Sequence, residues 1–270
     1  MFPPELPPVS NRALYVYRVF GKWFSFFFFG LITLILLTLI FPIMHLFFHP
    51  RERFRKYGRC FVSASMRFFV RVMTIVGVVK LEFTDREAYR HIKSKIIAAN
   101  HPSLLDIVML LSLIPNADCI VNANLQRGIA GGVIRQLYIL NSLNYEDLFR
   151  ACSESLAQGN CLIIFPEGTR TPRQGKIIFK KGTARVALAS GCGILPVHIG
   201  GTDKYGLGKK DPWTAFNPVD RYVYNISMGE EISPAHYANL PVPAAVRAMT
   251  KDMFACLFPQ QKIPLADNSC

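Results

Sequence analysis

A long apolar run near the N-terminus constrains this 270-residue chain more than any other feature. No Lys, Arg, Asp or Glu occurs from Trp23 to Phe48, and the run contains four consecutive phenylalanines at 26–29. As a helix it would be about 39 Å long, against a hydrocarbon core of about 30 Å. The apolar core is too long for a cleaved signal peptide, and no small-x-small site precedes the basic stretch that follows. We therefore predict an N-terminal membrane-associated helical segment.

Pro42 lies inside this run and leaves two interpretations open: a tilted span, or a helical hairpin that enters one leaflet. Basic residues flank the run on both sides: Arg12, Arg18 and Lys22 before it, and Arg51, Arg53, Arg55, Lys56 and Arg59 after it. If the run spans, the positive-inside rule puts the rest of the chain on the cytoplasmic side. We expect a bacterial inner membrane as the location.

The charge balance is strongly basic, with 31 Lys and Arg against 18 Asp and Glu and a net charge of +13. Such an excess suits nucleic acid, an anionic membrane surface or an acidic protein partner. Much of the charge flanks the apolar run and no known nucleic-acid motif occurs, so we expect no nucleic-acid partner. The seven cysteines are scattered without a C-x-x-C pair, which indicates free thiols and no metal site.

Residues 51–76 form a second predicted helix, in which arginines alternate with phenylalanines. Beside a membrane segment this pattern favours a basic amphipathic helix lying at the lipid interface. The alternative is an ordinary surface helix packed on the following domain. We place the first unit, an anchor with its amphipathic helix, at residues 1–76 and a second domain at 77–270.

Beyond Gly77 short β runs alternate with helical patterns. The predicted strands are 78–83, 95–99, 118–123, 160–165, 194–199 and 221–228, and the predicted helices are 104–113, 145–158, 182–190 and 242–257. This alternation predicts an α/β fold with a mixed, mostly parallel sheet flanked by helices. The segment 200–220, rich in Gly, Lys and Pro, is a long loop of the kind that borders a functional site.

The first candidate for chemistry is the segment Asn-His-Pro-Ser-Leu-Leu-Asp at 100–106. A spacing of five does not bring two side chains together on one continuous helix. Pro102 keeps His101 outside the helix, because a residue before proline is disfavoured in the α region. The ring can then fold back so that Asp106 accepts the Nδ1 proton and Nε2 is free as a general base. The alternative is that Ser103 and Asp106 only form a capping box.

The second candidate is Phe-Pro-Glu-Gly-Thr-Arg at 165–170, which follows an apolar strand. Ligands of open α/β sheets bind at the carboxyl ends of strands. The segment offers a flexible glycine, a hydroxyl, a carboxylate for a polyol and a guanidinium for a phosphate: Gly168, Thr169, Glu167 and Arg170. The alternative is a strand-ending turn with a surface ion pair. The lysines that follow are either phosphate ligands or a solvated loop: Lys176, Lys180 and Lys181. Pro196 should bend the pocket wall.

Together four ordered segments resemble the glycerophospholipid acyltransferase family, which includes 1-acylglycerol-3-phosphate and glycerol-3-phosphate acyltransferases. They are N-H-P-S-L-L-D, F-P-E-G-T-R-T, F-K-K-G-T-A-R-V-A-L-A and I-L-P-V, and the similar region runs from about Val78 to Met228. Four collinear blocks are far more specific than one. The resemblance implies that 77–270 is an acyltransferase catalytic domain behind a membrane helix pair.

The resemblance also implies a role for each site residue. His101 would deprotonate the acceptor hydroxyl and Asp106 would orient it, while Pro196 would shape the acyl site. The turn with Glu167, Gly168, Thr169 and Arg170 would bind the acceptor's phosphate head group. Apart from the resemblance, Lys181 and Asn141 are further candidates for substrate binding. One block departs from the family pattern, because Asn141 stands where the family usually has a phosphate-binding arginine. An asparagine lacks the charge and the fork of donors, so the acceptor is open.

The expected function is transfer of a fatty acyl group from an acyl-carrier-protein or coenzyme A thioester to the hydroxyl of a lysophospholipid. With 1-acylglycerol 3-phosphate as acceptor the product is phosphatidate. Backbone N–H groups after Pro102 are candidate oxyanion donors. We expect no cofactor besides the thioester, and membrane lipids as partners. An acceptor of an aryl-polyene pigment pathway is one alternative, and a non-catalytic lipid-binding membrane protein on the same fold is another.

Overall fold

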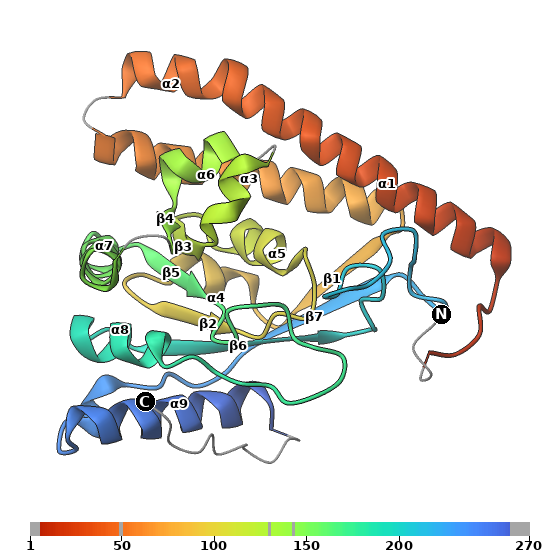
Figure 1. Cartoon of the computed structure of the whole chain (residues 1–270). Coiled ribbons are helices and arrows are strands. Elements are labelled where there is room, and N and C mark those ends of the chain that lie inside the picture. The colour runs from red at the N-terminus through yellow and green to blue at the C-terminus, as the bar shows by residue number, and fades with distance from the viewer. Residues whose placement is uncertain (1–5, 49–50, 129–130, 142–143, 260–270) are drawn as a thin grey trace.

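A seven-stranded sheet lies at the centre of the computed structural model, which describes residues 6–48, 51–128, 131–141 and 144–259 (Figure 1). The spatial order is β1-β7-β6-β2-β5-β3-β4. β6 pairs antiparallel with β7, and all other neighbours are parallel. The mixed, mostly parallel sheet predicted from the sequence is confirmed. The strands are β1 (Val79–Phe83), β2 (Ile96–Ala99), β3 (Ala117–Val121), β4 (Ile139–Leu140), β5 (Cys161–Ile164), β6 (Ile194–Gly201) and β7 (Tyr222–Met228).

Helices cover both faces of the sheet, as Figure 1 shows. Successive side chains of a strand point to opposite faces. In β2, Ile97 and Ala99 therefore join the core beneath α3 and α5, while Ile96 and Ala98 join the core beneath α8 and α9. The helices are α3 (Arg51–Ile75), α4 (Arg86–His91), α5 (Asp106–Leu113), α6 (Gly131–Leu137), α7 (Tyr145–Ala157), α8 (Gly182–Ser190) and α9 (Val242–Leu257).

All six strands and all four helices predicted after Gly77 are present, with ends shifted by two residues at most. The helix predicted from residue 104 begins at Asp106. The structure adds short elements that carry too few residues for a periodic pattern. These are the two-residue β4, the helices α4 and α6, and two 3₁₀ segments, η2 (Ala123–Arg127) and η3 (Pro234–Tyr237). The segment between β6 and β7 is a long loop, as expected.

The apolar run forms one helical rod that continues through Pro42. α1 (Arg12–Ile35) passes through a π-helical turn, η1 (Leu36–Ile40), into α2 (Phe41–Phe47). Phe41 N–H bonds the carbonyl of Leu36, and this wider turn accommodates a proline that has no N–H and crowds the preceding turn. The rod does not turn at Pro42, and α3 returns along it (Figure 1). A tilted span and a helical hairpin that enters one leaflet both stay predictions. Arg12–Phe47 is long and apolar enough to cross a membrane.

Two of the basic residues ahead of the apolar run are bound to the loop between β6 and β7. Lys22 is buried, and its Nζ donates to the carbonyl oxygens of Trp213 (2.6 Å) and Ala215 (2.5 Å). Arg18 pairs with Asp220 at 3.0 Å. These cations connect the rod to the α/β domain, so their charges do not simply flank a membrane span.

One side of α3, the helix predicted to lie at the lipid interface, is packed inside the molecule. Phe54, Phe69 and Met73 belong to its buried side and join the core with α5. Arg59 is also buried and pairs with Asp118 of β3 at 3.2 Å. The buried side fits the alternative of a helix packed on the domain, and a position of the exposed side at a lipid interface stays a prediction. The division at residue 76 stays a prediction, and the core extends across it.

Candidate active site

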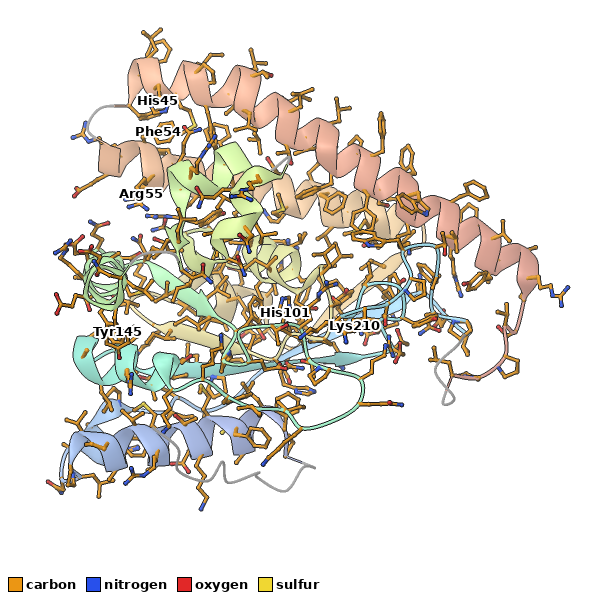
Figure 2. The ribbon with its side chains drawn as sticks, in the orientation of Figure 1. His45, Phe54, Arg55, His101, Tyr145 and Lys210 are labelled. Carbon is orange, nitrogen blue, oxygen red and sulfur yellow. The ribbon has the colours of Figure 1, made fainter. Side chains whose placement is uncertain are left out.

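The two sequence segments with candidate chemistry meet at one edge of the sheet. His101 follows β2 and the turn at 165–170 follows β5, and these strands are parallel neighbours. Adjacent strands are about 4.8 Å apart, so their carboxyl ends bring the two segments together. Figure 2 shows His101 near the middle of the molecule, far from His45 in α2.

His101 and Asp106 form a hydrogen-bonded dyad. His101 Nδ1 lies 2.8 Å from Asp106 Oδ2. The histidine side chain is 18% exposed, whereas the aspartate is fully buried. Within the part of the chain that the structure describes, Nε2 has no hydrogen-bond partner. The folded-back geometry predicted from Pro102 is what the structure shows, and it leaves Nε2 able to accept a proton.

The capping-box alternative is also partly correct, because Asp106 serves both arrangements. Its Oδ2 accepts the backbone N–H of Ser103 at 2.7 Å, and its Oδ1 accepts the Ser103 hydroxyl at 2.5 Å. The carboxylate thus receives two donors from the start of α5 besides the imidazole. These bonds fix its orientation toward His101, so the cap supports the dyad and does not compete with it.

A buried polar chain continues behind the dyad. Because the Ser103 hydroxyl donates to Asp106, the Tyr224 hydroxyl donates to Ser103 Oγ, at 2.7 Å. Lys204 Nζ lies 4.7 Å from the centre of the Tyr224 ring and donates to the carbonyl oxygens of Gly200, Thr202 and Val223. Burial lowers the Lys204 pKa to about 8, an effect that the charge of Asp106 partly offsets.

The backbone of His101 is held by the turn after β5. Its N–H donates to Glu167 Oε1 (3.0 Å) and to Thr171 Oγ1 (3.2 Å), and its carbonyl accepts the Thr171 N–H at 2.7 Å. The imidazole stacks on Phe165 with 4.1 Å between ring centres. Phe165 and Thr171 both belong to the segment F-P-E-G-T-R-T, but the sequence alone did not predict that they contact His101.

Glu167 supports His101 more directly than expected. Its Oε1 also accepts the Thr171 hydroxyl at 2.6 Å, so this oxygen is not free for a polyol. Oε2 is buried and has no partner among the described residues. Burial raises the Glu167 pKa, against the hydrogen bonds from Thr171 and His101. The predicted contact with a polyol could therefore use only Oε2.

Arg170 is anchored by the loop between β6 and β7. Its Nη1 donates to the carbonyl oxygens of Leu207 and Gly208, each at 2.9 Å. Nε and Nη2 have no partner among the residues that the structure describes, so two donors remain for an anion. The predicted phosphate contact stays a prediction.

Lys180 is the lysine that lies against the turn at 165–170, as the space around Gly168 shows. Gly168 has a φ of +64°, a conformation that glycine adopts at no steric cost. A Cβ atom at Gly168 would meet the side chain of Lys180 at 2.6 Å, so Lys180 lies against the turn. Lys181, the residue predicted to bind the acceptor, is exposed at the start of α8, and Thr169 is exposed beside Gly168.

Asn141 lies at the same edge of the sheet but farther along it. It follows β4, which is three strands away from β2 in the order of the sheet. The residue is exposed, and its Oδ1 accepts the backbone N–H of Ala123 at 2.9 Å while its own N–H donates to Val121. The structure thus gives Asn141 a local role in joining two loops.

Pro196 lies inside β6, opposite Ala98 of β2. Its carbonyl accepts the N–H of Gly229, just past the end of β7. In a β-strand, the N–H and the carbonyl of one residue point to the same side of the strand. The side on which Pro196 lacks an N–H is therefore the side of β7, and β7 has already ended at this position. Because partners in register share a face of the sheet, Pro196 lies on the α8 and α9 side with Ala98. Its predicted acyl-site role stays a prediction.

The backbone donors expected to form the oxyanion site are occupied. Ser103 N–H donates to Asp106, Leu104 N–H to the carbonyl of Leu207, and Leu105 N–H to the hydroxyl of Ser103. The candidate placed after Pro102 is therefore wrong for these three groups. No group of three or more His, Cys, Asp or Glu suited to a metal ion occurs in the described ranges.

A model of the family described as Acyltransferase matches residues 80–200, which include the dyad, the turn at 165–170 and Pro196. A chloroplastic 1-acyl-sn-glycerol-3-phosphate acyltransferase of Arabidopsis thaliana is 28% identical over 179 residues, 63% of this chain and 48% of the plant protein. Residues 80–200 thus belong to the Acyltransferase family, and the chain is similar to glycerophospholipid acyltransferases. A further relative, a 1-acyl-sn-glycerol-3-phosphate acyltransferase of Cocos nucifera, is 31% identical over 57% of this chain and 50% of its own length.

The chain spans about half the length of the curated relatives it matches. Its fold resembles the crystal structure of a 1-acyl-sn-glycerophosphate acyltransferase from Thermotoga maritima, with a TM-score of 0.63 and 21% identity. The likeness covers 90% of this chain and 98% of the other. The shared fold therefore extends well beyond the region that the family model matches.

Proposed function

We propose that the protein is a membrane-bound acyltransferase that moves a fatty acyl group from a thioester to the hydroxyl of a lysophospholipid, with 1-acylglycerol 3-phosphate as the favoured acceptor. The single observation that carries the proposal is the 2.8 Å contact between His101 Nδ1 and Asp106 Oδ2, with Nε2 left without a partner among the described residues. The names of the relatives support the choice of acceptor.

The dyad supplies the proton transfer. Asp106 holds the tautomer in which Nδ1 carries the hydrogen, so Nε2 accepts the proton of the acceptor hydroxyl. The acceptor oxygen attacks the thioester carbonyl, and the new C–O bond forms as the C–S bond breaks. The proton on Nε2 then passes to the departing thiolate of coenzyme A or the acyl carrier protein. No covalent enzyme intermediate is needed, because the substrate provides the nucleophile.

The membrane anchor is the outward side of the rod formed by α1 and α2. Large apolar side chains are exposed along it, including Phe20, Phe24, Phe27, Leu46 and Phe47. Because α3 and the loop between β6 and β7 hold the rod on the domain, the anchor brings the active site to the lipid surface. The basic residues that follow the rod favour the cytoplasmic leaflet of a bacterial inner membrane.

The acceptor's phosphate lies between the turn at 165–170 and the basic side chains beside it. Arg170 retains two guanidinium donors, and Lys180 lies against Gly168. Both belong to the edge that carries His101, so a bound phosphate would place a nearby hydroxyl within reach of Nε2. Asn141 offers no charge for this purpose.

The test compares membranes that contain wild-type protein with membranes that contain His101→Ala protein. Each is incubated with acyl-carrier-protein and coenzyme A thioesters and with a panel of acceptors: lysophosphatidate, glycerol 3-phosphate, other lysophospholipids and a non-phosphorylated alcohol. Mass spectrometry scores the new esters. We expect phosphatidate with the wild type and a loss of at least about 1000-fold with His101→Ala. Normal turnover by a folded His101→Ala protein would end the proposal, and reaction only with the non-phosphorylated alcohol would move the acceptor to the alternative class.

A further inference from the structure

A cleft lies away from the dyad, between α3 and α4. Its volume is about 640 Å³, and we call it the α3–α4 cleft. Ser112 and Leu113 line it at the end of α5, whereas Asp106 begins that helix. Because an α-helix rises 1.5 Å per residue, the two sites are about 10 Å apart along α5. The lining residues that matter for its chemistry are Arg67, Arg71, Arg86, Arg90, Phe68 and Ile75.

The cleft contains an excess of positive charge. Of its four arginines only Arg90 has a carboxylate partner, Glu87 at 2.9 Å. Within the described ranges, no carboxylate oxygen lies within 4.0 Å of the guanidinium groups of Arg67, Arg71 or Arg86. Burial, followed by the charges of Arg90 and Arg86, lowers the Arg67 pKa. Glu87 is one carboxylate against four guanidinium groups in the cleft, and an anion with several oxygen acceptors would relieve the repulsion that remains.

One wall of the cleft is apolar and continues toward the membrane rod. The side chains of Phe68 and Ile75 are 53% and 78% exposed. The Phe68 ring lies 5.9 Å from that of Phe28 in α1, and Phe28 stacks on the exposed Phe24. The apolar surface therefore runs from the cleft to the outward side of the rod. A small soluble anion would leave this wall unused.

We propose that the α3–α4 cleft binds an anionic phospholipid, whose phosphate lies among the arginines and whose acyl chains lie along Phe68 and Ile75. The combination of guanidinium groups and exposed apolar side chains matches a molecule with both a phosphate and a hydrocarbon tail. The inference rests on the membrane association in the proposed function, but it does not depend on acyl transfer. An acidic carrier protein or free coenzyme A would match the charge without requiring the apolar wall.

The test measures binding of the purified full-length protein to lipid nanodiscs made of phosphatidylcholine alone or with phosphatidylglycerol added. The test variant is Arg71→Gln with Arg86→Gln. The matched control is Arg53→Gln with Lys56→Gln, which removes two exposed charges from the same helix outside the cleft. We expect the test variant to lose on the order of 20-fold in affinity for phosphatidylglycerol nanodiscs, because each basic residue near an anionic surface contributes about 1 kcal/mol. The control should lose much less.

Native mass spectrometry of the same proteins counts retained phosphatidylglycerol molecules. The wild type and the control variant should keep one that the test variant loses, at equal thermal stability. Equal losses in both variants would mean diffuse surface attraction and would overturn the proposal. So would a test variant that keeps phosphatidylglycerol but loses an acidic carrier protein or coenzyme A. Because His101→Ala leaves the cleft intact, it should bind lipid normally, which separates this inference from the proposed reaction.

Discussion

The ends of β2 and β4 lie on the same edge of the sheet, yet they are built differently. At the end of β2, His101 is fixed through its ring, its N–H and its carbonyl, and Asp106 behind it is fully buried. At the end of β4, Asn141 is exposed and bonds only nearby backbone groups among the described residues. The first end is pre-organised for one geometry, whereas the second tolerates replacement.

This difference separates the reaction from the choice of acceptor. A base must be held within hydrogen-bond reach of the proton it removes, so errors of an ångström are costly. Recognition of a phosphate can be shared among several cations at the exposed edge of a site, and we propose Arg170 and Lys180 for that role. The dyad can therefore be complete although Asn141 stands where the family usually has a phosphate-binding arginine. The following experiments test whether the two ends are really independent.

Replacing the buried carboxylate should have the largest effect. In Asp106→Asn the amide can donate toward Nδ1 and stabilise the wrong tautomer, so kcat should fall by roughly 1000-fold or more. Initial rates of ester formation with lysophosphatidate measure it. The KM for the acceptor should change little, because Asp106 does not reach the exposed edge of the site where Arg170 and Lys180 lie. A variant whose loss appears in KM alone would contradict the separation of the two ends.

The buried polar chain behind the dyad predicts an unusual dependence of stability on pH. The Lys204 pKa is about 8 in the folded protein against 10.5 when unfolded, so the unfolded chain binds more protons between these values. Stability from this residue must therefore rise with pH in that window. The unfolding free energy of wild type minus that of Lys204→Met should increase by about 3 kcal/mol from pH 8 to 10.5.

Urea unfolding in a mild detergent across that pH range provides the measurement. Groups common to both proteins, such as the buried tyrosines, cancel in the difference. Methionine keeps much of the volume of the lysine stem, so packing changes little. If the unfolding free energies of the two proteins change in parallel with pH, the Lys204 pKa is not lowered by burial. Lys204 would then have no part in the polar chain behind the dyad.

Restoring the family's arginine tests the other end of the comparison. In Asn141→Arg a new guanidinium at the rim should lower the KM for lysophosphatidate by about tenfold, since a hydrogen bond to a charged group contributes about 1.5 kcal/mol or more. The KM for a non-phosphorylated acceptor should stay the same. The loss of the Asn141 bond to Ala123 adds a small stability cost, which Asn141→Ala measures separately. An unchanged KM for lysophosphatidate would place the phosphate elsewhere.

What could be predicted from the sequence follows the same division. The contact between His101 and Asp106 is local and a proline sets its geometry, so five residues were enough. The alternating strand patterns gave the sheet. The contacts of Tyr224 with Ser103 and of Thr171 with His101 could not be predicted, because the partners lie 121 and 70 positions apart in the sequence. The contacts of Lys204 could not be predicted either, because they depend on how the loop between β6 and β7 folds. The sequence also left the packing of α3 open, since a helix with one side packed on a domain has the same amphipathic pattern as one at a lipid surface.

The smallest effect on kcat should come from Tyr224, which reaches the dyad only through Ser103. Tyr224→Phe removes one hydroxyl that donates to Ser103 Oγ, while Asp106 keeps its bonds from Ser103 and His101. We expect kcat to fall about fivefold, which corresponds to about 1 kcal/mol for a neutral hydrogen bond. The acceptor KM should be unchanged, and the pH profile of kcat should shift because the carboxylate loses indirect support. If Tyr224 acted only in packing, the profile would keep its shape and only the thermal stability would change. Such a result would confine the pre-organised region to Ser103 and the turn after β5. The ends of β2 and β4 would then differ less than their hydrogen bonds suggest.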